Sequence, residues 1–152
     1  MSVEARLKDL GITLPDAPKP VANYVPAVKT GNLVFVSGQV SAAGGETVKG
    51  RLGDGLALEE GQKGARLCAL AVLAQVNALV GSLDKVKRIV KLGGFVACTP
   101  DFDQHPAVIN GASDLMVEVF GEVGQHARFA VGVPSLPLGF AVEVDAIVEV
   151  EA

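Results

Sequence analysis

Residues 126–150 read H-A-R-F-A-V-G-V-P-S-L-P-L-G-F-A-V-E-V-D-A-I-V-E-V, and this stretch decides the fold. Two runs of alternating or β-branched residues flank a loop rich in proline and glycine, a pattern typical of a strand, a turn and a second strand. Arg128 opens the first run, and Glu143 lies early in the second. An arginine buried among small apolar neighbours needs an anionic partner. That partner is Glu143, another acid of the chain or the carboxylate of a ligand.

The rest of the chain alternates strand and helix patterns. Capping and turn residues and hydrophobic periodicity predict a short helix over 2–10 and strands over 21–28 and 33–37, joined by the turn K-T-G-N. A short third strand is expected within the glycine-rich segment 41–55. Two helices are expected over 58–80 and 105–120, with a strand over 86–99 between them. The order β-β-β-α-β-α-β-β predicts an α+β fold in which a mixed six-stranded sheet carries two helices on one face. Residues 1–152 are expected to form one domain, with 1–20 as a proline-rich N-terminal extension.

The glycine pair Gly93-Gly94 stands inside the strand pattern of 86–99. Paired glycines in a strand indicate a bulge or a close approach of another part of the chain. Residues 67–74 of the first long helix are apolar on all sides, which predicts burial against a sheet or a neighbouring subunit.

Composition excludes several classes of protein. The net charge is −4, and the nearest basic patch (Lys85, Lys87, Arg88 and Lys91) has no interleaved aromatic residues, so nucleic acid is not the expected partner. No uninterrupted apolar run reaches the roughly 18–20 residues that span a bilayer, and the N-terminus lacks the apolar core of a signal peptide. We expect a cytoplasmic protein. A hydrophobic fraction of 49% points instead to an interface between subunits.

Candidate metal ligands and nucleophiles are sparse. Cys68 and Cys98 have no cluster of histidine and acidic residues at metal-ligand spacing, and they are expected to be buried free thiols. His105 and His126 are expected at the surface. Ser37 has no neighbouring histidine and acid, which makes it a poor nucleophile candidate. We therefore expect no metal site.

Four segments together carry a family resemblance. They are N-Y-V-P-A-V at 23–28, G-N-L-V-F-V-S-G-Q-V at 31–40, V-I-N-G at 108–111, and the stretch 126–148. The chain resembles the reactive intermediate deaminase family, also called RidA or YjgF-type, over residues 20–150. The resemblance implies a chorismate-mutase-like fold, a homotrimer with clefts between its subunits, and no cofactor.

The resemblance also implies a set of site residues, which fall on Tyr24, Gly38, Asn110, Arg128, Ala130 and Glu143. Arg128 and the backbone amide of Ala130 would bind a substrate carboxylate, and the backbone of Gly38 would line the pocket. Glu143, through a water, would move a proton and activate the attacking water, and Tyr24 would hydrogen-bond the water or the substrate nitrogen. Two departures stand out: Phe129 follows the arginine where small residues are common, and the N-terminus is long, as in a side branch of the family.

Relatives of this kind hydrolyse enamines and imines, such as 2-aminoacrylate, to 2-keto acids and ammonia, and this is the hypothesis that we carry forward. The alternative is a non-catalytic protein that binds small carboxylates such as keto acids. A ribonuclease or translation inhibitor is disfavoured by the acidic charge.

Each site residue also has a purely structural interpretation. Arg128 is then part of an ion pair, Glu143 lies in a solvent-facing row with Asp145 and Glu149, Tyr24 packs, Asn110 caps a helix and Gly38 serves a turn. A register slip of one residue decides whether Arg128 and Glu143 share a face of the sheet. The sequence leaves open whether they meet within one chain or across subunits.

Overall fold

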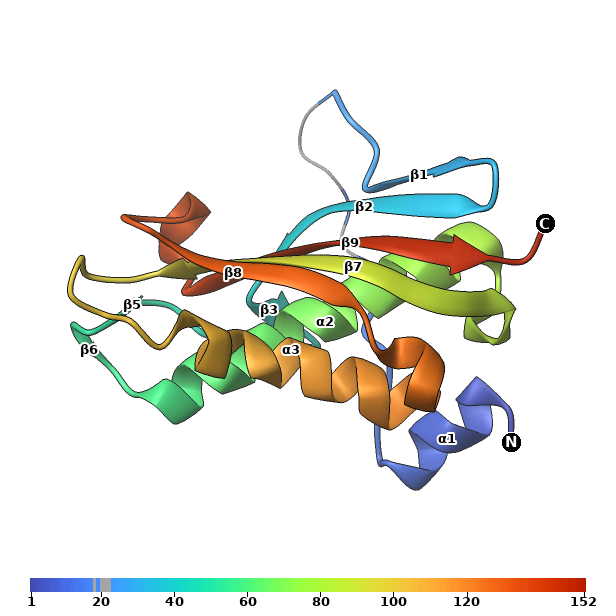
Figure 1. Ribbon diagram of the computed structural model, residues 1–152, viewed down its shortest axis with the longest axis horizontal. Coiled ribbons are helices and arrows are strands. Elements are labelled where there is room, and N and C mark those ends of the chain that lie inside the picture. The colour runs from blue at the N-terminus through green and yellow to red at the C-terminus, as the bar shows by residue number, and fades with distance from the viewer. Residues whose placement is uncertain (18, 20–22) are drawn as a thin grey trace.

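A computed structural model describes residues 1–17, 19 and 23–152, and Figure 1 shows its arrangement. The helices are α1 (Val3–Asp9), α2 (Leu58–Val80) and α3 (His105–Phe120), with short 3-10 segments η1 (Leu83–Lys85), η2 (Gly121–Gly124) and η3 (Pro137–Gly139). Within the described residues, one mixed sheet is built from β1 (Ala27–Thr30), β2 (Leu33–Val40), β9 (Val142–Val150), β7 (Val86–Ala97) and β8 (Ala127–Val133), in that spatial order.

The sheet is covered on one side only. Helices α2 and α3 lie against one face and bury the core between themselves and the sheet. The opposite face, here called the open face, is covered by no α-helix of the described residues (Figure 1). Alternate residues of β9 from Val142 to Val150 are buried toward the helices, whereas those between them, from Glu143 to Glu149, are half-buried. This α+β architecture confirms the predicted fold class.

The predicted count of six strands in one sheet is wrong for the described residues, which place five there. The expected third strand instead forms a separate ribbon of β3 (Ala42–Ala43) and β4 (Glu46–Thr47), and β5 (Arg51–Leu52) pairs with β6 (Gly55–Leu56) in another. The chain leaves the main sheet at the buried Ser41, whose hydroxyl donates to the carbonyl of Val48 at 2.7 Å.

The first predicted strand is displaced along the chain. Residues 21 and 22 lie outside the described part, and pairing with β2 begins only at Ala27, immediately after Pro26. Because proline has no N–H to donate, it is a poor member of a strand ladder. The turn between β1 and β2 is short, because Thr30 already pairs with Leu33. Gly31 in this turn has a φ of 57°, a conformation that glycine adopts without steric cost.

The two closing strands do not pair with each other. β7 lies between them, antiparallel to β9 and parallel to β8. Helix α3 connects β7 to β8, and a crossover of this length joins parallel neighbours. β8 is therefore an edge strand, with its outer side free of any strand in the described chain.

The glycine pair in β7 marks close approaches on both faces. A Cβ at Gly94 would meet Ile109 of α3 at 2.6 Å, and a Cβ at Gly93 would meet the ring of Phe129 at 2.6 Å on the open face. The bulges of β7 lie earlier, between Val86 and Arg88 and between Ile89 and Lys91.

Both long helices have the predicted bounds. α2 begins where the backbone N–H of Ala57 donates to the carboxylate of Glu60 at 3.2 Å, and it ends at Gly81, whose φ is 91°. By length and composition α2 is apolar enough to cross a membrane, but 61% of its most apolar window is buried inside the protein. It is the core helix of this sheet-and-helix sandwich.

Candidate functional site

Arg128 and Glu143 lie on opposite faces of the sheet. Glu143 is paired with Phe95 of β7, and Phe95 is paired with Val131 of β8, so these three side chains share a face. Arg128 precedes Val131 by an odd number of residues and therefore faces the other way, toward α3. Within one chain the two groups therefore cannot form an ion pair.

Glu143 belongs to a cleft at the β2 edge of the sheet. β1 pairs with β2 only as far as Val36, so the edge of β2 from Ser37 to Val40 has no β1 neighbour. A cleft of about 340 Å³ opens there. Its lining includes Tyr24, Ser37, Gly38, Gln75, Phe140 and Glu143. We call it the β2-edge cleft, and it brings together three of the predicted site residues.

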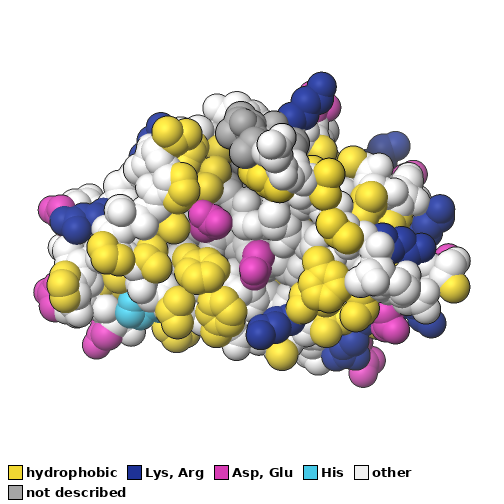
Figure 2. Space-filling model, turned by 90° about the horizontal axis from the view of Figure 1, so that it is seen from above, with side chains coloured by type: hydrophobic (Ala, Val, Ile, Leu, Met, Phe, Trp, Pro, Cys, Tyr) yellow, Lys and Arg dark blue, Asp and Glu magenta, His cyan; other side chains and the backbone are white. Residues whose placement is uncertain are grey.

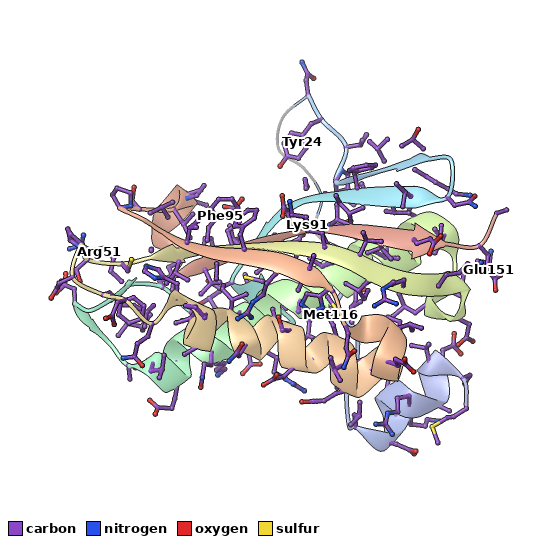
Figure 3. All side chains as sticks on the ribbon, in the orientation of Figure 1. Tyr24, Arg51, Lys91, Phe95, Met116 and Glu151 are labelled. Carbon is purple, nitrogen blue, oxygen red and sulfur yellow. The ribbon has the colours of Figure 1, made fainter. Side chains whose placement is uncertain are left out.

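Gly38 and Glu143 are in direct contact in this cleft. A Cβ at Gly38 would overlap the carboxylate of Glu143, so only glycine leaves room for that side chain. The turn interpretation of Gly38 is therefore incomplete, because its φ is not in the left-handed region. Tyr24 lies in the loop above the sheet with 53% of its surface exposed, which does not fit a packing role (Figure 3).

The environment of Glu143 keeps its carboxyl protonated to a higher pH than the carboxyl of an exposed glutamate. Burial raises the pKa of Glu143 above its ordinary value, and the nearby carboxylate of Asp145 adds to the rise. Both effects penalise the charged form. A carboxyl with a raised pKa, next to a cleft, is the kind of group that exchanges protons with a bound molecule.

The floor of the β2-edge cleft is polar and buried. Gln39 donates from Nε2 to the carbonyl of Ser37 at 3.1 Å, and Gln75 of α2 donates to the amide oxygen of Gln39 at 3.4 Å. Both glutamines are more than nine-tenths buried. These bonds fix the bulge in β2 between Val36 and Gln39, and with it the position of Gly38.

Arg128 is held at the other edge of the sheet by neutral groups. Its Nη1 donates to the hydroxyl of Ser113 at 3.0 Å, and its Nη2 donates to the carbonyl of Pro106 at 3.2 Å, both on α3. None of the ion pairs found among the described residues involves Arg128. The ion-pair interpretation of Arg128 is therefore wrong in the described chain, and three of its five N–H donors remain beyond these two bonds.

His126 extends this arrangement and is not the surface residue that the sequence suggested. Its Nδ1 lies 2.7 Å from the carbonyl of Gly124, which can only accept, so Nδ1 carries the proton. Its Nε2 then accepts from the hydroxyl of Ser113 at 2.8 Å. Burial lowers the pKa of His126, as does the charge of Arg128, so the ring is neutral at pH 7. No motif singles out Ser113 or His126, because their roles arise from contact between α3 and β8.

Asn110 and Ala130 complete what we call the β8-edge cluster, defined as Asn110, Ser113, His126, Arg128 and Ala130. Asn110 is an exposed residue in the second turn of α3, so it does not cap the helix, whose N-cap is Gln104. Three positions separate it from Ser113, which places both on one side of the helix. Ala130 shares the face of Arg128 and is half-buried.

Phe129 points away from the β8-edge cluster. Its ring lies on the open face over Gly93 and packs edge-on against Phe95, with ring centroids 5.3 Å apart. Within one chain it therefore does not narrow the space beside Arg128.

The open face is unusually apolar for an uncovered sheet. Figure 2 shows this face, with apolar side chains gathered around acidic groups near its centre. The large exposed apolar residues that the strand pairing assigns to it are Val28, Phe35, Phe129 and Val131. An exposed patch of this kind marks an interaction surface. No group of three or more potential metal ligands occurs in the part of the chain that the structure describes.

Comparison with known proteins identifies the family. The model of the family described as "YjgF/chorismate_mutase-like, putative endoribonuclease" matches residues 4–150. The chain belongs to this YjgF family. The resemblance seen in the sequence is thus confirmed.

Individual relatives agree over nearly the full chain. Protein TCP17 of Trypanosoma cruzi is 53% identical over 149 residues, covering 97% of this chain and 93% of the relative. A protein of Dermatophagoides farinae named 2-iminobutanoate/2-iminopropanoate deaminase is 32% identical over 143 residues, covering 92% and 95%. The crystal structure of Atu1372 from Agrobacterium tumefaciens superposes with a TM-score of 0.90 at 50% identity, covering 98% and 92%.

Proposed function

We propose that this protein is a cofactor-independent enamine and imine deaminase, which converts small 2-amino-acrylate-type compounds and their imines to 2-keto acids and ammonia. The observation that carries the proposal is an arginine held ready by neutral acceptors, without an acidic partner among the described residues. Such a guanidinium suits a carboxylate ligand. The Dermatophagoides relative, whose name states this activity, supports the same reading.

The chemistry requires one proton shuttle and one water. The enamine gains a proton at carbon to become an imine, water adds to the imine carbon, and the resulting amino alcohol loses ammonia to leave the keto acid. Glu143, with its raised pKa, suits both the delivery and the removal of a proton. Tyr24, at the mouth of the same cleft, is the candidate for holding the water or the nitrogen. Positioning supplies most of the rate effect, since the substrate is already reactive.

We further propose that each working site is shared by two copies of the chain. The β2-edge cleft and the β8-edge cluster lie toward opposite edges of the sheet, so a head-to-tail neighbour is the simplest way to unite them. Head-to-tail contacts that close on themselves form rings, of which a homotrimer is the expected case here. Burial of the apolar open face in the centre of such a ring accounts for the side chains exposed on it. We expect the trimer in the cytoplasm, where the free thiols Cys68 and Cys98 persist.

The direct test is turnover of 2-iminobutanoate generated in solution from its amino acid by an oxidase. The proposal expects the purified protein to accelerate the formation of ammonia and 2-ketobutyrate over the spontaneous rate. Size-exclusion chromatography with light scattering on the same sample should give the mass of a trimer.

The outcome that contradicts the proposal is equally definite. Tight binding of 2-ketobutyrate without acceleration of any imine would favour a non-catalytic carboxylate-binding protein. The family description also names endoribonuclease; RNA cleavage that is lost on substitution of Arg128 or Glu143 would replace the deaminase proposal.

A further inference from the structure

A second cavity lies at the end of the molecule where β7 and β8 finish and α3 begins. Its volume is about 490 Å³. The side chains that matter for its chemistry are Arg51, Cys98, Phe102 and His105, with Gly132 in its wall. Figure 3 shows Arg51 at this end of the molecule. None of the six residues that the family resemblance assigns to the substrate site lines this cavity.

A thiol and an imidazole are in contact in the cavity. The Sγ of Cys98 lies 3.3 Å from Nε2 of His105, the first residue of α3. Phe102 packs edge-on against the imidazole, with ring centroids 5.4 Å apart, and so holds the ring in place. The contact is therefore a fixed pair of a nucleophile and a base, which is the minimal arrangement for activating a thiol.

Gly132 lets the backbone of β8 lie close to this pair. A Cβ at Gly132 would lie 2.5 Å from Nε2 of His105 and 2.6 Å from Sγ of Cys98. Any other residue at position 132 would thus push into the space beside both atoms. The absence of a side chain there lets the thiol and the imidazole lie directly against the backbone of β8 in the wall of the cavity.

The surroundings define how the thiol would react. Burial raises the pKa of Cys98, and the charge of Arg51 opposes that rise. The sulfur is accordingly protonated at neutral pH, and its proton must leave as the sulfur attacks. His105 is the base within reach, and the N-terminus of α3 is the positive end of a 16-residue helix, which favours negative charge nearby.

We propose that Cys98 and His105 form a covalent binding site for small, neutral, soft electrophiles of the α,β-unsaturated carbonyl class. The sulfur forms a bond to the β-carbon, the π electrons of the double bond move toward the α-carbon, and the thiol proton passes through Nε2 of His105 to that carbon. No oxidant or leaving group is needed. The inference stands on its own and does not depend on the deaminase proposal.

A neutral electrophile is favoured because the rim of the cavity carries no excess of positive charge. Arg51 is paired with Asp54 at 3.0 Å. The carboxylate of Asp101 also acts on Cys98 and raises the pKa of the thiol. An anionic electrophile would gain nothing from this set of charges.

The test treats the native protein with acrylamide, a small neutral α,β-unsaturated amide, and follows each cysteine by peptide mass spectrometry. Cys68 is an internal control, because its residue has no exposed surface. We expect Cys98 to be alkylated at least about tenfold faster than Cys68. We expect His105→Phe, which keeps a ring against Phe102 but removes the base, to slow the reaction of Cys98 by about 100-fold, the low end of general-base effects.

Two further variants make the result decisive. His105→Gln removes the base with a smaller side chain and should slow the reaction similarly, and Gly132→Ala should slow it by displacing the thiol and the imidazole from their contact. Thermal denaturation checks that each variant is folded. Equal alkylation of Cys98 and Cys68 in the native protein, or an unchanged rate for Cys98 in both folded His105 variants, would overturn the proposal.

Discussion

The two edges of the sheet differ in what they hold and in how they hold it. At the β2 edge, a cleft encloses a carboxyl that burial makes reluctant to ionise. At the β8 edge, a permanent cation is tied to a hydroxyl and a carbonyl on α3. The acid lies in a formed cleft whose lining includes Lys19 but not Arg128, whereas Arg128 has fixed geometry and forms no ion pair among the described residues.

Under the proposed function, this difference explains why one chain alone would not form a complete site. A buried carboxyl and an arginine within one pocket would neutralise each other and leave little affinity for a ligand carboxylate. Holding them on opposite faces of one sheet prevents that pairing within the chain. We infer that they are brought near each other only across a subunit contact, where a substrate can lie between them.

The largest expected effect comes from removing the cation. Arg128→Ala should lower kcat/KM for imine hydrolysis by 100-fold or more, roughly the worth of a charged bidentate contact. Arg128→Lys keeps the positive charge but lacks the planar guanidinium that donates two parallel hydrogen bonds, so it should recover only part of the lost kcat/KM. Steady-state kinetics on the two variants measure the difference, and equal activity of Arg128→Ala and the wild type would remove the arginine from the site.

The next largest effect is expected from a substitution that moves Glu143 in the β2-edge cleft. Gly38→Ala would place a Cβ in the space of the Glu143 carboxylate and displace it. We expect kcat to fall by about 10- to 100-fold, since a displaced acid-base group loses its geometry. Binding of 2-ketobutyrate, measured by calorimetry, should weaken less than kcat falls. A variant with normal kcat would show that the position of Glu143 is unimportant.

A smaller effect tests how the arginine is held. Ser113→Ala removes the acceptor between Arg128 and His126. We expect KM to rise by about 5- to 10-fold, the usual worth of one hydrogen bond, with less change in kcat. Ser113→Thr retains the hydroxyl and should behave like the wild type. A loss of activity shared equally by both variants would indicate a packing effect instead.

The smallest effect is on stability. The pKa of Glu143 is raised in the folded protein. Its contribution to the free energy of unfolding is therefore fully present below about pH 4, where the carboxyl is protonated in both the folded and the unfolded state. This contribution is lost as the pH rises through the raised pKa of the folded protein. Glu143→Gln removes this penalty, so its Tm should exceed that of the wild type by a few degrees at pH 8. The difference should vanish near pH 4. A lower Tm for Glu143→Gln at pH 8 would argue that the ionised form is stabilised.

Local signals in the sequence were sufficient for the helices and the fold class. The glycine after Val80 and the acidic first turn of α2 delimit that helix, and Gly121 delimits α3. The strand order was not accessible in the same way. Nothing in residues 126–150 states that β7 separates the two closing strands, because that depends on how α3 crosses over the sheet.

The residues of the candidate site likewise fall into those that the sequence predicted and those whose roles depend on tertiary contacts. Tyr24, Gly38 and Glu143 were predicted from motifs, and they line one cleft. Ser113 and His126 were not predicted, since their contacts with each other and with Arg128 join residues of α3 to the start of β8 without a sequence pattern. Face assignment also required the register, because a shift of one residue would have put Arg128 on the same face of the sheet as Glu143.

The most direct test of a shared site mixes two inactive variants. Arg128→Ala and Glu143→Gln are each expected to be inactive alone, but a ring containing both has some contacts at which one chain supplies Arg128 and its neighbour supplies Glu143. After subunits are exchanged in equal amounts, about a quarter of the sites should be intact, and activity should return to about a quarter of the wild-type value. Mixed rings that form but remain inactive would contradict the account.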